Sequence, residues 1–131
     1  MKLLPIRLSP GADLRTALEA AIEEQGIDSA FVLSGIGSLV DARLRFANEA
    51  AEALISGPLE LVSIAGTLTS SGSHLHVAVS DRNGAVTGGH LSYGSVVRTT
   101  AEILLAPLDE WALSREHDVQ TGFNELVIRT R

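Results

Sequence analysis

The chain contains no cysteine and only five aromatic residues among its 131. The absence of cysteine excludes thiol catalysis, disulfide bonds and zinc-thiolate sites, and it leaves histidine as the only side chain that offers a nitrogen ligand to a metal. Basic residues are also few, because ten Lys and Arg stand against 16 Asp and Glu and give a formal net charge of −6. Without a long basic run to offset it, this charge argues against electrostatic capture of nucleic acid by the whole surface.

The hydrophobic content of 45% is high enough for a core. Because a chain of about 130 residues buries roughly two thirds of the surface that it exposes when unfolded, we expect residues 1–131 to form one globular domain. Segment 61–80 has no charged residue, but glycine, serine, threonine and histidine interrupt it, so we do not interpret it as a membrane span. The N-terminal residues form no secretory hydrophobic region, and we expect the protein in the cytoplasm.

One amphipathic helix stands out near the N-terminus. From Leu14 to Ile22 apolar residues recur at helical spacing, while the other side carries Arg and Glu. Gly26 occupies the position where a helix commonly ends. The pattern therefore predicts a helix over about residues 13–25.

The rest of the chain has mainly the pattern of β-strands. Gly35 and Gly37 are expected to end an uncharged strand near Ser34. Residues 48–56 fit either a poorly formed strand or a short helix. A single helix followed by mostly hairpin-connected strands predicts an α+β fold with a largely antiparallel sheet. The predicted strands cover residues 3–8, 29–34, 41–46, 59–68, 73–80, 85–91, 96–105 and 125–130.

Three of the four histidines lie in the stretch HLHVAVSDRNGAVTGGH, residues 74–90. Alternation along a strand places His74 and His76 on one face, while the valines and leucine between and after them face the core. The turn Asp81-Arg82-Asn83-Gly84 has the composition of a three-residue hairpin loop that ends on a glycine in the left-handed region. The histidine side chains therefore lie on the polar face of a predicted hairpin.

The length of this loop decides whether the third histidine joins the other two. A three-residue loop places His76 directly opposite His90, and His74 opposite Ser92, so three imidazoles converge on one small ion. A two-residue loop at Asn83-Gly84 would instead pair His90 with Val77 and turn it to the other face.

Two interpretations of the histidines remain open. They form a divalent transition-metal site with His74, His76 and His90 as ligands and zinc as the first candidate, or they only hydrogen-bond on a polar sheet face or a subunit interface. His117 lies in the charged stretch REHD and is expected to be a solvated surface group.

Two neighbouring features bear on the same site. The pair Gly88-Gly89 either allows backbone or ligand to approach the sheet closely or forms a β-bulge, and we expect the bulge. Glu60 stands in an apolar strand, where it is a candidate fourth ligand or general base, or an outward-facing edge residue.

The sequence resembles the plants-and-prokaryotes conserved (PPC) domain family, whose plant members combine this domain with AT-hooks in nuclear DNA-associated proteins. The resemblance spans most of the chain and is carried by LSGIGSLVDARLRF at 33–46, GPLELVSIAGTL at 57–68 and HLHVAVSDRNGAVTGGHL at 74–91. It implies an α/β fold with a largely antiparallel sheet, a homotrimer and protein partners. The family's HxH and GGH positions correspond to His74, His76 and His90, which adds weight to the metal hypothesis.

The resemblance also implies a DNA-binding label, but the AT-hook core Arg-Gly-Arg-Pro does not occur in this chain. Our first hypothesis is therefore a trimeric binding or assembly module that carries a histidine-bound metal. The second is a metal-dependent enzyme acting on a small molecule, with Glu60 as a candidate base. The third is direct nucleic-acid binding, for which four arginines must gather on one face, namely Arg43, Arg45, Arg82 and Arg98.

Overall fold

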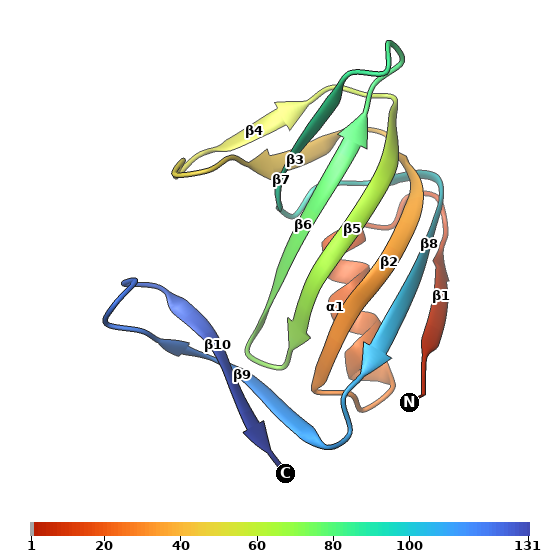
Figure 1. The fold of residues 1–131 in the computed structure, drawn as a ribbon. Helices are drawn as coiled ribbons and strands as arrows, with labels where there is room; N and C mark the ends of the chain where they lie inside the picture. Colours follow the sequence, from red (N-terminus) through yellow and green to blue (C-terminus); the bar gives the residue numbers. More distant parts are fainter. Residues whose placement is uncertain (1) are drawn as a thin grey trace.

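The computed structural model describes residues 2–131 and contains one helix and ten strands over that range (Figure 1). Eight strands form one antiparallel sheet in the order β1-β8-β2-β5-β6-β7-β3-β4, and the last two form a separate hairpin. The elements are β1 (Leu4–Leu8), α1 (Leu14–Glu24), β2 (Ser29–Leu39), β3 (Ala42–Arg45), β4 (Glu52–Ile55), β5 (Leu59–Thr69), β6 (Gly72–Ser80), β7 (Val86–Leu91), β8 (Val97–Pro107), β9 (Trp111–His117) and β10 (Asn124–Thr130).

The predicted helix and fold class are confirmed. The Asp13 side chain caps α1 by accepting a hydrogen bond of 2.9 Å from the backbone N–H of Thr16. The apolar stripe of α1 buries Leu14, Leu18 and Ile22 in the core against the strands. In Figure 1 the helix lies behind the sheet, so the opposite face of the sheet carries no helix. No helix in the part of the chain that the structure describes is long and apolar enough to cross a bilayer.

The β6–β7 hairpin has the predicted three-residue loop. The Asp81 backbone N–H donates to the Ala85 carbonyl at 3.0 Å, and Gly84 adopts a φ of 80°. The Asp81 carboxylate accepts hydrogen bonds from the backbone N–H groups of Asn83 and Ala85, at 2.8 and 3.0 Å. The loop fixes a register in which His76 pairs with His90, so the alternative two-residue loop is excluded.

The prediction that the strand after α1 ends near Ser34 is wrong. Strand β2 continues through Gly35 and Gly37 to Leu39, with irregular pairing to β8 on either side of the glycines. A Cβ on Gly37 would overlap the Thr100 carbonyl oxygen and lie 2.7 Å from the Cα of Ala101. The glycines therefore do not interrupt the strand; they let β8 approach it closely.

The structure decides one ambiguous segment and contains one strand that the sequence pattern does not predict. The ambiguous residues 48–56 contain the strand β4, which pairs with β3. Strand β9 was not predicted, because its sequence WALSREH has weak alternation and three charged or titratable residues at its end. Its pairing with β10, from Trp111 opposite Thr130 to His117 opposite Asn124, supplies the hydrogen bonds that define it.

The close approach at Gly37 generates a stability prediction. The change Gly37→Ala should lower the free energy of unfolding by more than about 1 kcal/mol, because backbone atoms of β8 must shift to admit the methyl group. Urea denaturation monitored by circular dichroism measures this change. Gly88→Ala, whose Cβ would lie 3.0 Å from the nearest atom, the Val77 carbonyl oxygen, should cost less. Equal stabilities of the Gly37 variant and the wild type would contradict the argument.

Candidate metal centre

The structure brings His74, His76 and His90 together on the sheet face opposite α1. His74 and His76 lie two residues apart on β6, and His90 lies directly across from His76 on β7. Each ring can offer one nitrogen such that these atoms all lie within 4.8 Å of one another. The Nε2 atoms of His74 and His76 are 3.1 Å apart, and the ring centroids of His76 and His90 are separated by 4.5 Å.

Strand alternation explains this convergence. Between and after the histidines, Leu75, Val77 and Val79 point into the core and are at most 5% exposed. Their burial fixes which face of β6 is turned outward, and the intervening His74 and His76 therefore project away from the core. The hairpin register then adds His90 to the same face.

Two arginines flank the three histidines. Arg45 on β3 lies directly across from His90 on β7, so the two side chains leave the same face of the sheet. Arg115 reaches the other side of the cluster from β9, where its Nη2 donates to the hydroxyl of Thr67. Thr67 is the β5 partner of His74. The order across this region is therefore arginine, three histidines, arginine.

The surroundings favour neutral imidazoles. Burial lowers the pKa of His74 below its ordinary value of 6.5, and the nearby charges of Arg115, His76 and Arg45 lower it further, whereas Glu125 opposes the shift. The pKa of His90 is lowered by burial first and then by Arg45 and the other two histidines. Neutral rings have a free lone pair for a metal.

The donor set fits a borderline transition metal. Within residues 2–131, these three histidines are the one group of three or more His, Cys, Asp or Glu side chains close enough to share an ion. Three nitrogens without a carboxylate suit zinc and related divalent metals better than magnesium or calcium, which prefer oxygen ligands.

Glu60 does not belong to this cluster. It pairs with Ser80 across β5 and β6, whereas His76 pairs with Ala65. Ser80 lies four residues from His76, which corresponds to about 13 Å along a strand. Glu60 is exposed on the outer face, as one of the sequence alternatives stated, but β5 is an interior strand and not an edge.

The structure also tests the predictions for the Gly88-Gly89 pair, for the partner of His74 and for His117. The β-bulge expected at Gly88-Gly89 is wrong, since β6 and β7 pair without a register shift. The close-approach alternative holds, because a Cβ on Gly89 would lie 2.9 Å from the carbonyl oxygen of Arg45. The ladder of β6 and β7 ends at His76 and His90, so it does not include the expected pair of His74 with Ser92. His117 is exposed on β9 and is not a member of the cluster, as expected.

Sequence patterns do not predict Arg115 or the part of the site that β9 and β10 contribute. A cavity of about 540 Å³ lies beside His74 and His90, and its other walls include Arg45, Arg115 and Phe123. Arg115 is distant in sequence from the histidines, and no spacing rule connects them. The sequence contains no signal that would have placed it there.

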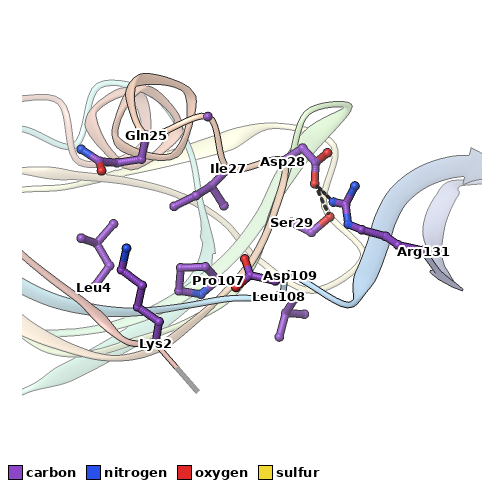
Figure 2. Close-up of a pocket in the computed structure, with 11 residues that line it drawn as sticks. Lys2, Leu4, Gln25, Ile27, Asp28, Ser29, Pro107, Leu108, Asp109 and Arg131 are labelled. Atoms are coloured by element: carbon purple, nitrogen blue, oxygen red, sulfur yellow. Dashed lines mark hydrogen bonds and ion pairs between the residues drawn. The ribbon is translucent and has the colours of Figure 1, made fainter.

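A separate cavity of about 440 Å³ lies between β1, the end of α1 and the start of the β8–β9 connection (Figure 2). Its Asp28 carboxylate is already paired with the hydroxyl of Ser29 and the guanidinium of Arg131. No histidine lines this cavity. It therefore offers weaker grounds for a site than the histidine cluster does.

The chain is similar in sequence to part of a longer curated protein. The chain is 43% identical over 129 residues, 98% of its length, to the bifunctional protein GlmU of Synechococcus sp. (strain JA-2-3B'a(2-13)). It spans about a fifth of the length of that curated relative.

Solved structures cover nearly the whole fold. A hypothetical protein from Salmonella cholerae-suis superposes with a TM-score of 0.96 at 36% identity, covering 99% of this chain and 94% of the other. A metal-containing protein from Archaeoglobus fulgidus gives a TM-score of 0.84 at 29% identity, covering 97% and 94% of the two chains. The family model of the Plants and Prokaryotes Conserved domain, abbreviated PCC or PPC, matches residues 1–109. The chain therefore belongs to this family.

Proposed function

We propose that this PPC protein is a metal-binding module in which His74, His76 and His90 hold one divalent transition metal, with zinc the first candidate. The observation that carries the proposal is the convergence of three imidazole nitrogens within 4.8 Å. The description of the Archaeoglobus fulgidus relative as metal-containing supports it. Imidazole ligands favour zinc over harder cations, and the lowered pKa of His74 and His90 keeps both rings neutral and free to bind a metal.

We also propose that the protein assembles as a homotrimer through the sheet face that α1 leaves uncovered. Four apolar side chains on β2 and β5 are 36 to 56% exposed, namely Phe31, Leu33, Ile36 and Val62. Several exposed apolar side chains on neighbouring strands are typical of an interface. The number of three subunits follows from the resemblance to the PPC family.

A second candidate function is catalysis on a small molecule. The observation that favours it is the cavity of about 540 Å³ beside His74 and His90. Three protein ligands leave coordination positions open, which is the arrangement of catalytic zinc sites. Glu60 is too far from the cluster to act as its base, so this candidate needs another proton acceptor.

Direct DNA binding has little support from the charge of the chain, because the formal net charge is −6. Arg43 and Arg45 share a face of β3, and the Arg43 backbone N–H donates at 3.0 Å to the hydroxyl of Ser95, three residues before Arg98. The assembly and metal proposals therefore rank above nucleic-acid binding.

The metal proposal predicts about one equivalent of zinc or another transition metal per chain after purification without a tag or chelator. The double change His76→Ala and His90→Ala should abolish this content, since one ligand cannot hold the ion. Elemental analysis measures it. His117→Ala is the matched control, because His117 is exposed outside the cluster and its loss should leave the metal content unchanged. Wild-type protein that remains metal-free after addition of zinc would contradict the proposal.

The lowered pKa values predict how metal binding depends on pH. In metal-free protein, the rings of His74 and His90 should titrate below pH 6.5 and stay neutral above it. Zinc affinity should fall as the pH drops through these midpoints, because protons then compete with the metal for the same nitrogens. Arg45→Gln should move the midpoint of His90 upward more than that of His74, because Arg45 lies directly across from His90, whereas His74 lies one strand further away on β6. NMR titration of the rings measures both midpoints, and midpoints at or above 6.5 would contradict the stated cause.

The assembly proposal predicts a mass in light scattering of three times the 13.8 kDa chain. Val62→Asp should shift the mass toward that of one chain, because a charge would be buried at the apolar contact. Val119→Asp is the control, since Val119 is 89% exposed in the turn of the β9–β10 hairpin. A monomer at micromolar concentration for the wild type would overturn the proposed interface.

A further inference from the structure

The two arginines beside the histidine cluster have no carboxylate partner. Over residues 2–131 the arginines that form ion pairs with carboxylates are Arg15, Arg129 and Arg131. Arg45 instead donates from Nη1 to the backbone carbonyl of Glu49 at 3.2 Å. Glu52 lies across from Arg45 on β4 but forms no ion pair with it.

Arg115 has a buried hydrogen-bond donor that no other described residue accepts. Its Nη2 donates to Thr67, while its Nε is buried and has no hydrogen-bond partner among the described residues. Burial lowers the pKa of this guanidinium. A buried donor without a partner is costly, more so when the group is charged. An anion close to the guanidinium would offset this cost.

Both arginines face one cavity. The space of about 540 Å³ is lined by Arg45, Arg115, His74 and His90 together, with Phe123 and Glu125 from the β9–β10 hairpin. Two guanidinium groups against one carboxylate give it a net positive charge, and a divalent metal on the histidines would make it more positive. An opposite charge is therefore the complement that this cavity lacks.

We propose that this cavity binds a small organic acid whose carboxylate or phosphate group lies between Arg45 and Arg115, next to the histidines. Guanidinium groups recognise both oxyanions through paired hydrogen bonds. The cavity volume falls in the range of small-molecule sites and exceeds what an inorganic anion fills. Phe123 offers an apolar surface for the carbon skeleton of the ligand. The inference deepens the proposed metal function and rests on it for the strength of anion binding, because a metal on the histidines would add positive charge to the same cavity.

Calorimetric titration of zinc-loaded protein with malonate and with glycerol 3-phosphate tests the inference, and glycerol serves as the uncharged comparison. Binding of at least one of the acids and no binding of glycerol is expected. Arg45→Gln should weaken binding at least tenfold, and so should Arg115→Lys, which keeps the charge but loses the planar donor pair. Arg7→Gln, on the edge strand β1 at the other side of the sheet, should bind like the wild type.

The outcomes separate the two proposals. If zinc is retained but neither acid binds, or if the arginine variants bind as well as the wild type, the anion cavity is overturned while the metal site stands. If the protein takes up no zinc but metal-free protein binds an acid through both arginines, the metal proposal fails and the cavity stands. The preference between malonate and glycerol 3-phosphate identifies the head group. Equal affinity for inorganic phosphate and glycerol 3-phosphate would contradict an organic ligand.

Discussion

The register of the β6–β7 hairpin is the constraint on which the candidate site depends. Its loop is held by the Asp81 carboxylate, which accepts hydrogen bonds from the backbone N–H groups of Asn83 and Ala85. With the register so fixed, His90 emerges beside His76. A slip of one residue would turn His90 into the core and leave a pair of histidines, which is a much weaker metal site. A carboxylate at the tip of the hairpin thus determines the geometry several residues away.

The hairpin and α1 were predictable because their determinants are local. Turn composition, strand alternation and helical spacing each act within a few residues, and together they placed all three histidines on one face. The path of β2 was not predictable in this way. Gly35 and Gly37 read as interruptions in isolation, and only the position of β8 shows that they are contact points between neighbouring strands.

The remaining part of the site depends on contacts between distant segments. Arg45 reaches His90 because Gly89 lets β3 lie close to β7. Arg115 arrives from β9, a strand whose alternation is too weak to predict, and is located by its contact with Thr67. The electrostatic character of the site therefore follows from tertiary packing, whereas its histidines follow from local sequence.

The β9–β10 hairpin lies outside residues 1–109, the range matched by the family model, yet it contributes Arg115, Phe123 and Glu125 to the cavity beside the histidines. Its strands hydrogen-bond mainly to each other, as a ribbon separate from the eight-stranded sheet (Figure 1). Substitutions on this ribbon can therefore reshape one wall of the cavity without moving β6 or β7. The eight-stranded sheet therefore fixes the positions of the histidines, whereas the β9–β10 hairpin shapes the cavity beside them. A relative with the same three histidines is free to differ in the ligand that this cavity binds.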